Sequence, residues 1–199
     1  MIAQRIARGI LRFLGWTLVS KAPDLPKYVV IGAPHTTNWD FPIGILGLIG
    51  LGIKPSVVAK HTLFRPPLGW LMRALGSMPI DRSQRRNFVD QVVAAYKEAD
   101  ELVVALTPEG TRSYTPCWKT GFYFIALGAG VPIALAFADY PTRRVGLGPT
   151  LRPTGDIEAD MAVIAEFYAD KTGKRPENKS PIRVRPPDYP AEEPRAKRL

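Results

Sequence analysis

The chain has 199 residues, of which 46% are hydrophobic and 23% charged, a balance that predicts one globular domain and excludes a disordered or fibrous protein. The formal charge of +9 and the isoelectric point near 9.8 predict attraction to an anionic partner: nucleic acid, an acidic lipid surface or a phosphorylated substrate. With Cys117 as the only cysteine and two histidines, we expect no disulfide, no metal site and a reducing compartment.

Residues 1–19 predict an amphipathic basic helix. At 100° per residue, Arg5, Arg8 and Arg12 fall within about 60°, opposite a cluster of apolar side chains, namely Ile2, Ile6, Ile10, Phe13 and Leu14. Such a helix can lie in the headgroup region of an anionic membrane with Trp16 at the boundary, or it can dock on the protein's own core. No apolar run reaches the ~18 residues of a spanning helix, so we expect peripheral attachment at the cytoplasmic face of a membrane.

From residue 27 onward, short apolar runs alternate with helical patterns. We expect buried strands at residues 28–31, 56–59, 78–80, 102–106 and 131–137. The clearest helix covers residues 85–99, where Phe88, Val92 and Tyr96 recur every four residues. Residues 41–52 are apolar all round and fit a buried or interface-lying helix.

These patterns predict the α/β class: a single domain over residues 21–175 with a mostly parallel or mixed central sheet flanked by helices. The N-terminal amphipathic helix, placed within residues 1–20, precedes this domain. Six prolines between Pro176 and Pro194, mixed with charges, predict an extended or disordered Pro-rich basic tail over residues 176–199. We assign this tail no chemistry.

The segment IGAPHTTNWDF places His35 after the first strand and Asp40 five residues later, just before an apolar helix. Within one helix this spacing would turn the side chains ~140° apart, so they meet only if His35 lies in the loop and Asp40 near the helix start. The carboxylate can then hold one ring nitrogen and leave the other as a general base. The alternative is that Asp40 merely caps the helix. Because the chain has no G-x-S-x-G elbow, we expect the nucleophile to come from the substrate.

A second group of polar residues follows the strand LVVAL, at the position where α/β proteins bind ligands. Gly110 lets backbone approach a ligand closely, Thr111 offers a hydroxyl, and Arg112 supplies a planar fork suited to a phosphate monoester. We expect Glu109 either to bind a polar hydroxyl or to hold an arginine in place. The segment MPIDRSQ adds Arg82, which converges with Arg112 if the two strands are neighbours; otherwise each arginine belongs to a solvated surface pair.

The blocks HTTNWD, MPIDR, PEGTRS and GVPIA, in this order and at these spacings, resemble the four motifs of the glycerol-phosphate and lysophosphatidic acid acyltransferase family, the PlsC-like enzymes. The resemblance covers about residues 27–139 and includes VAKHTLF and CWKTGFYFIALGAG. Its departures are Pro34, where the family often has asparagine, and Leu135, where it often has a second proline. These departures leave the His/Asp pair and the arginines untouched.

The resemblance implies acyl transfer from acyl-CoA or acyl-carrier protein to the hydroxyl of a lysophospholipid, with 1-acyl-sn-glycerol-3-phosphate as the expected acceptor and no cofactor. His35 and Asp40 map onto the family's catalytic pair. The acceptor phosphate is bound by the second and third motifs, which points to Arg82, Glu109, Gly110 and Arg112, with Lys60 joining them. The fourth motif, containing Pro132, lies near the acyl side of the site, although a strand entrance explains this proline equally well.

Three other functions stay open. Transfer can go to another lysolipid, with an ornithine or sugar head group. Cys117 can act as the nucleophile of a thioesterase with His35 as its base. A nucleic-acid-binding protein would explain the positive charge, but the chain has no helix-turn-helix, zinc-finger or RNP-type pattern, so we expect no nucleic acid partner.

Overall fold

The computed structural model describes residues 2–60, 78–80 and 85–185, with the backbone alone described at 57–60, 78–80 and 85–87. The chain forms, in order, α1 (Ile2–Phe13), β1 (Thr17–Val19), β2 (Lys27–Gly32), α2 (Asp40–Gly50), β3 (Ser56–Lys60), β4 (Met78–Ile80), α4 (Arg85–Glu98), β5 (Leu102–Leu106), α5 (Gly121–Ala129), β6 (Ile133–Asp139), β7 (Arg144–Leu151), α6 (Ile157–Tyr168) and the 3₁₀ turn η2 (Pro176–Asn178).

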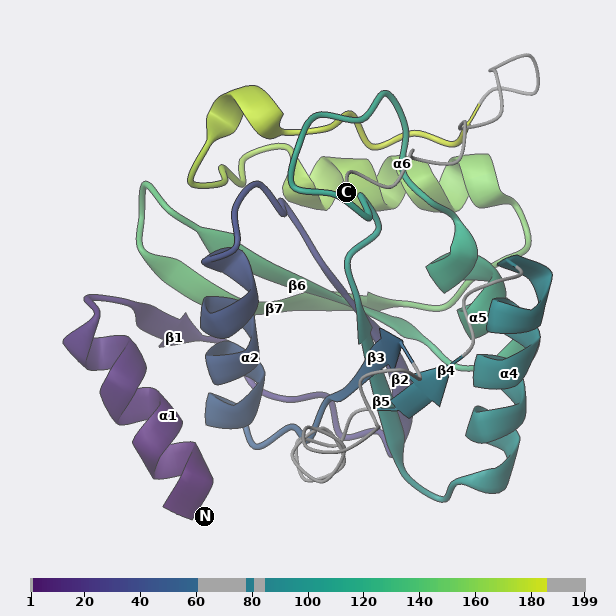
Figure 1. Ribbon diagram of the computed structural model, residues 1–199, viewed down its shortest axis with the longest axis horizontal. Helices are drawn as coiled ribbons and strands as arrows, with labels where there is room; N and C mark the ends of the chain where they lie inside the picture. The colour runs from purple at the N-terminus through teal and green to yellow at the C-terminus, as the bar shows by residue number, and fades with distance from the viewer. Residues whose placement is uncertain (1, 61–77, 81–84, 186–199) are drawn as a thin grey trace, which may run out of the picture.

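Within the described residues, a sheet of seven strands has the order β1-β7-β6-β2-β5-β3-β4 (Figure 1). Strand β2 lies between β5 and β6 and is parallel to both, with Val29 opposite Val104 on one side and Ile133 on the other. Strand β7 returns antiparallel to β6, and β1 pairs in parallel with β7. The predicted α/β class with a mostly parallel or mixed central sheet is confirmed.

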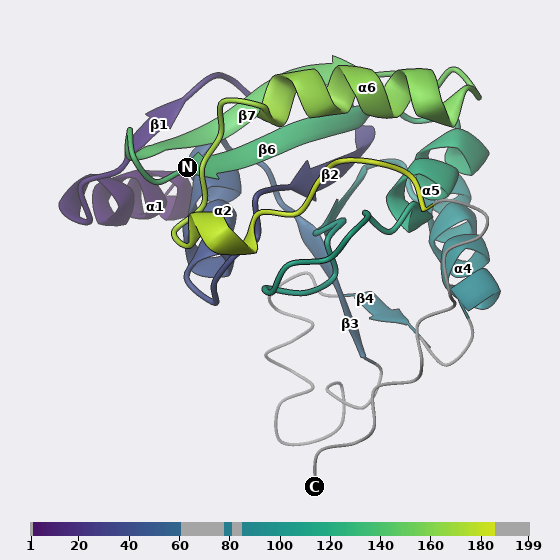
Figure 2. The same ribbon diagram turned by 90° about the horizontal axis from the view of Figure 1, so that it is seen from above.

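The two faces of the sheet carry different helices because side chains alternate along each strand (Figure 2). Val29 and Ile31 of β2 point into the core cluster that includes side chains of α4, α5 and α6. Tyr28 and Val30 point to the opposite face, which α2 covers. Helix α1 packs beside α2 through its buried Leu11. The functional loops therefore emerge from a sheet that is covered on both faces.

The structure differs from the predicted helix over residues 1–19, because residues 17–19 form β1 and pair with β7. The helix ends near Gly15, whose φ of 76° is the left-handed conformation that glycine adopts without strain. Beyond it, the β-branched Thr17 and Val19 complete the edge of the sheet. The N-terminal segment is therefore part of the domain and not an appendage.

The predicted tail also differs from the structure over residues 176–185. Lys179 Nζ donates to the carbonyl oxygens of Tyr168, Ala169 and Lys171, where α6 ends, at 2.8–3.1 Å. Ile182 and Val184 pack on the main core. Proline-rich composition correctly predicted the lack of a long helix, but irregular backbone still packs when apolar side chains alternate along it. Residues 186–199 of the predicted tail lie outside the described residues.

The sequence patterns also did not predict α5, β7, α6 and η2. Helix α6 begins at Asp156, whose side chain accepts a hydrogen bond from the Ala159 amide at 3.1 Å. At its other end the Tyr168 hydroxyl lies 3.0 Å and 2.9 Å from the carbonyl oxygens of Ile31 and Ala136. Among the described residues, no helix is long and apolar enough to cross a membrane.

Candidate active site

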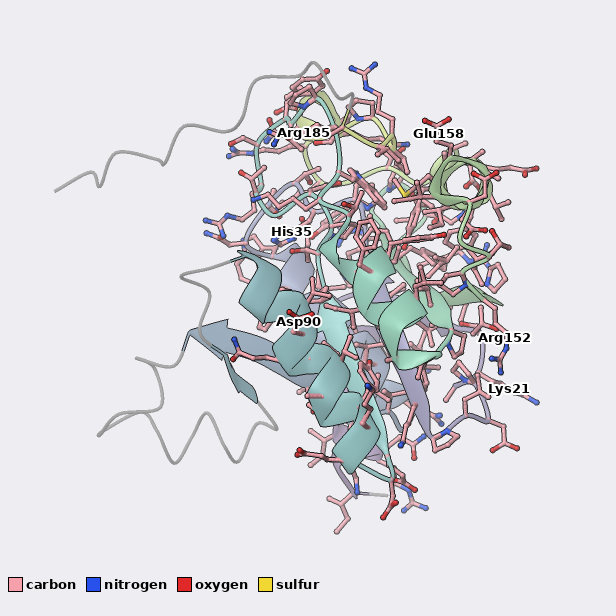
Figure 3. The ribbon with its side chains drawn as sticks, turned by 90° about the vertical axis from the view of Figure 1, so that its right-hand side faces the viewer. Lys21, His35, Asp90, Arg152, Glu158 and Arg185 are labelled. Atoms are coloured by element: carbon pink, nitrogen blue, oxygen red, sulfur yellow. The ribbon has the colours of Figure 1, made fainter. Side chains whose placement is uncertain are left out.

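Parallel strands bring the candidate residues to one edge of the sheet. His35 follows β2, Glu109 follows β5 and Tyr140 follows β6, and these three strands are adjacent and parallel. The carboxyl ends of such strands meet at one edge, which is where open α/β sheets bind ligands. Figure 3 places His35 at the same end of the molecule as Arg185.

The Asp40 carboxylate organises the loop that carries His35. Its Oδ2 accepts hydrogen bonds from the backbone amides of Thr36 and Thr37, both at 2.6 Å. Its Oδ1 accepts from the Thr37 hydroxyl at 3.0 Å and from the Tyr140 hydroxyl at 2.7 Å. The N-cap of α2 is Trp39 and has no side-chain cap bond, so the carboxylate serves the preceding loop and does not merely cap the helix.

These bonds keep Asp40 ionised. Burial by itself raises the pKa of Asp40, but hydrogen bonds from His35, Thr37, Tyr140 and Thr36 outweigh it, so the pKa lies below its usual value. Burial and the Asp40 charge raise the pKa of Tyr140, which therefore stays a hydroxyl donor. A negative charge thus sits permanently beside the imidazole at neutral pH.

The imidazole of His35 presents Nδ1 to Asp40, with 3.5 Å between Nδ1 and Oδ2. This distance exceeds that of a strong hydrogen bond, and catalytic hydrogen bonds of this kind commonly shorten in the Michaelis complex. The side chain is 12% exposed and lines a large cavity. Because Nδ1 faces the carboxylate, Nε2 is the nitrogen left to exchange a proton with a ligand.

Glu109 has a position that the sequence did not predict. Its side chain is 1% exposed, and its Oε2 accepts a hydrogen bond from the His35 backbone amide at 2.9 Å. Burial raises the pKa of Glu109 to about 8 despite this hydrogen bond, with the nearby Asp40 charge acting in the same direction. Glu109 is therefore largely neutral at pH 7. Glu109 supports the histidine's main chain, and its contact with substrate stays a prediction.

The other residues of the PEGTRS loop divide between two cavities. Gly110, with φ of 65°, lines the large cavity, and a Cβ at this position would meet the side chain of Lys119 at 2.9 Å. The Thr111 hydroxyl accepts a hydrogen bond from the Ser113 amide at 3.3 Å and so helps to order the loop. Arg112 is exposed and lines a second cavity.

Two predicted phosphate ligands are only partly placed. Lys60 ends β3, and its side chain is outside the described part of the structure. Arg82 lies in residues 81–84, outside the described residues. Strand β3 lies between β4 and β5, so the strands that precede Arg82 and Arg112 are not the immediate neighbours that we considered.

The large cavity has a volume of about 920 Å³ and a mostly apolar lining. It extends from His35 between α2 and the sheet, where many of the lining residues are small: Gly32, Gly44, Gly47, Ala105 and Ala136. Space remains there because no large side chain fills it. Cys117, the alternative nucleophile, is buried and lines the same cavity. A cavity of this size accommodates an extended apolar ligand.

The second cavity, of about 370 Å³, lies on the other side of the His35 loop and is basic. Its lining residues are Thr36, Thr37, Asn38, Trp39, Arg112, Ser113, Lys174, Arg175 and Asn178. The two cavities therefore share the loop between β2 and α2 as a common wall. Among the described residues, no group of three or more His, Cys, Asp or Glu side chains is arranged to hold a metal ion.

Sequence reasoning missed Tyr140 and Thr36. Tyr140 packs edge-on against Trp16, with ring centroids 4.9 Å apart, so the N-terminal segment supports its contact with Asp40. A sequence signal for Tyr140 exists, because this residue directly follows β6, a strand parallel to the one that precedes His35. Thr36 is buried and holds the segment after α6, a contact that depends on packing and has no local signal.

The raised pKa of Glu109 predicts a pH-dependent loss of stability. Since the folded-state pKa of about 8 exceeds the ordinary 4.5, folding favours the neutral acid, and this contribution is full below about pH 4.5 and lost as the pH rises through 8. Raising the pH from 5 to 8 should therefore destabilise the wild type relative to Glu109→Gln. The difference in the free energy of unfolding between the two proteins should change by about a few kcal/mol. Urea unfolding of both proteins at the two pH values measures this difference. Equal pH dependence in the two proteins would contradict it.

Comparison with known proteins identifies relatives of one kind. A 1-acyl-sn-glycerol-3-phosphate acyltransferase of Brassica napus chloroplasts is 32% identical over 130 residues, covering 61% of this chain and 35% of that protein. The Saccharomyces cerevisiae enzyme of the same name is 32% identical over 114 residues, covering 53% and 36%, and that of Pseudomonas aeruginosa is 26% identical over 174 residues, covering 73% and 64%. The chain spans about a third of the length of the first two relatives.

The fold is also found in a solved structure. The crystal structure of PlsC from Thermotoga maritima, a 1-acyl-sn-glycerophosphate acyltransferase, superposes with a TM-score of 0.58 at 16% identity, covering 83% of this chain and 75% of that one. The model of the family described as Acyltransferase matches residues 18–135, which include His35, Asp40 and the PEGTRS loop. More than half of the chain is matched, and the protein belongs to the Acyltransferase family.

Proposed function

We propose that this protein transfers a fatty acyl group from a thioester to the free hydroxyl of a lysophospholipid, with 1-acyl-sn-glycerol-3-phosphate as the preferred acceptor and phosphatidate as the product. The observation that carries the proposal is the position of the His35–Asp40 pair, on a loop that separates an apolar cavity from a basic one. An amphiphile matches both cavities, because its acyl chains suit the apolar one and its phosphate head suits the basic one. The names of the three relatives support the same acceptor.

The residues account for each proton in the proposed reaction. His35 Nε2 removes the proton of the acceptor hydroxyl as its oxygen attacks the thioester carbonyl, and the Asp40 carboxylate stabilises the resulting imidazolium. The tetrahedral intermediate collapses by breaking the carbon–sulfur bond, and His35 returns the proton to the departing thiolate. The products are the ester and a free thiol. The reaction as proposed needs no cofactor, and acyl-CoA or acyl-carrier protein serves as donor.

Arg112 supports a phosphate-bearing acceptor because its guanidinium lines the basic cavity beside the histidine loop. We propose that Lys60 and Arg82 add positive charge to the same phosphate. If the acceptor is instead a lysolipid with an ornithine or sugar head group, a panel of acceptors in a thiol-release assay will identify it.

The second candidate function is a thioesterase in which Cys117 is the nucleophile. The observation in its favour is that Cys117 and His35 line one cavity. Against it, the thiol is buried, and the donors around Asp40 are arranged to hold the imidazole without any contribution from Cys117.

Substitution of the pair distinguishes these two mechanisms. His35→Ala should lower kcat/KM for acyl transfer by ~10²–10⁴-fold, because a positioned acid-base group contributes this much. Asp40→Asn should also lower kcat/KM. Cys117→Ser should retain most of the turnover. Thiol release is measured with each variant, and circular dichroism serves as the folding control. Full activity in His35→Ala together with its loss in Cys117→Ser would establish the covalent mechanism instead.

The apolar cavity is proposed to hold an acyl chain. Helix α2 approaches β7 closely at Gly47, where a Cβ would lie 2.8 Å from Val145 Cγ2, but nothing lies within 4 Å of a Cβ built at Gly44. Gly44 therefore faces the open part of the cavity, and a side chain there would occupy space available to the ligand.

Gly44→Leu should shift the preference towards shorter acyl chains. The added side chain displaces two or three methylenes, each contributing ~0.8 kcal/mol when buried, so the ratio of kcat/KM for a long over a short thioester should fall by at least ~10-fold. Gly44→Ala is the control, because it adds helix propensity with little volume. An unchanged ratio in the leucine variant would show that the acyl chain does not lie beside α2.

Membrane attachment is proposed through α1, which has two apolar faces. Ala7 and Leu11 are buried against the domain, whereas Ile2, Ile6, Ile10 and Phe13 are exposed, Phe13 by 90%. Arg8 Nε donates to the Gly50 carbonyl at 2.7 Å, so this arginine fastens α1 to α2. Arg5 and Arg12 are exposed and are the two arginines we assign to anionic lipid of the cytoplasmic leaflet. Core docking and membrane binding are thus compatible.

Arg5→Gln/Arg12→Gln should weaken binding to anionic vesicles by ~2 kcal/mol, roughly 30-fold, because each basic residue near such a surface contributes ~1 kcal/mol. Ile6→Ser/Phe13→Ser should weaken binding to anionic and neutral vesicles alike. Vesicle sedimentation measures both, and Val163→Ser on α6, also exposed, is the control. Deleting residues 1–19 is unsuitable, because it removes Trp16 beneath Tyr140. Wild-type sedimentation of both double variants would refute attachment through α1.

A further inference from the structure

The segment Gly173–Asn178, which follows α6, is fixed to the histidine loop. A Cβ at Gly173 would lie 2.6 Å from the Thr36 side chain, so only glycine allows this approach. The Arg175 amide donates to Thr36 Oγ1 at 3.2 Å, and Asn178 Nδ2 lies 3.4 Å from the Thr36 carbonyl oxygen. Three contacts thus converge on Thr36, the residue immediately after His35 and one that is buried.

This attachment brings two cations to the basic cavity. Lys174 and Arg175 line it together with Arg112, which comes from the loop after β5. The ammonium group of Lys174 lies 5.4 Å from the ring centroid of Trp39, a cation–π contact that holds it at the cavity wall. No carboxylate is found among the described residues that line the cavity. Three positive groups therefore face a space that no acidic side chain of this lining neutralises.

The lining chemistry suits a phosphomonoester. Two guanidinium groups and one ammonium group donate charge-assisted hydrogen bonds to a tetrahedral dianion, while Thr37, Ser113 and Asn178 offer neutral polar groups. A carboxylate or a sulfate monoester has a single negative charge and would leave part of this positive charge unmatched. The cavity volume of about 370 Å³ is larger than a phosphate alone requires and leaves room for the group that bears it.

We propose that Lys174 and Arg175 form, with Arg112, a phosphomonoester-binding site that holds one substrate against the His35 loop. The inference rests on the proposed acyl transfer and deepens it. Both residues lie outside the matched family region, residues 18–135, and outside the four sequence motifs. The segment acts as a clamp: because it is fastened to Thr36, a phosphate bound by Lys174 and Arg175 is positioned relative to the neighbouring imidazole.

Two substrates carry such a group, the lysophosphatidate head and the 3′-phosphate of coenzyme A, and kinetics separate them. For Lys174→Gln/Arg175→Gln, the KM for lysophosphatidate should rise at least ~10-fold, because each charge-assisted hydrogen bond to phosphate contributes this much, while the KM for acyl-CoA stays within twofold. A rise confined to acyl-CoA supports the site and assigns it to the donor. No change above twofold for either substrate overturns the proposal.

A matched pair of surface cations serves as the control. Lys21 and Arg152 are exposed, and Figure 3 shows both of them away from His35. Lys21→Gln/Arg152→Gln removes the same charge and should leave both KM values unchanged. Equal effects of the two double variants would mean that net charge alone attracts the substrate, which also overturns the proposal. The single variants Lys174→Gln and Arg175→Gln give intermediate KM values if both residues bind.

Binding of glycerol 3-phosphate, measured by isothermal titration calorimetry, tests the site without turnover. The wild-type protein and the Lys21/Arg152 control should bind it equally, and Lys174→Gln/Arg175→Gln at least ~10-fold more weakly. Binding of this pattern in a protein that transfers no acyl group would retain the site and refute the proposed function. The opposite result is acyl transfer in which neither the kinetics nor glycerol 3-phosphate binding depends on Lys174 and Arg175. It would retain the proposed function and refute the site.

Discussion

The ionised carboxylate of Asp40 is the interaction on which the site depends. Five donors face it: the amides of Thr36 and Thr37, the Thr37 hydroxyl, the Tyr140 hydroxyl and the His35 ring. A buried carboxylate without these donors would be costly, so the fold around it and the orientation of the imidazole are coupled. The same bonds that hold the loop closed also keep Asp40 charged, which is what an imidazole acting as a base requires.

Two buried carboxyl groups contact His35, and they differ in protonation state: Asp40 is ionised and Glu109 is largely neutral. Asp40, rich in donors, has a lowered pKa and faces the ring, whereas Glu109, buried with one donor from His35, has a raised pKa and holds the backbone. The different environments give the two carboxyl groups different charges, because two buried negative charges near each other would repel. A neutral Glu109 also adds no repulsion against the proposed anionic substrate at the neighbouring loop.

The two faces of the sheet serve different purposes. On one, Val29, Ile31 and Ile133 interdigitate with α4, α5 and α6 and form the largest core cluster. On the other, the glycine and alanine residues of α2 and of the strands near His35 leave unfilled space, which is part of the apolar cavity. Trp118 and Phe122 belong to this cluster and also line the cavity, so the core forms part of the wall of the space proposed for the acyl chain. The basic cavity lies beyond the His35 loop, so apolar and charged parts of one amphiphile can be bound on the two sides of a single histidine.

The sequence by itself determined the α/β class, the strands before His35 and Glu109, and the rule that Asp40 must begin a helix to meet His35, since these follow from periodicity and spacing. Only tertiary structure decided that residues 17–19 complete the sheet, that Glu109 faces the His35 backbone, and that Lys174 and Arg175 line the basic cavity. The physical reason is that each of these depends on contacts between residues far apart in the chain, such as Thr36 with Arg175, which leave no local pattern in composition or period.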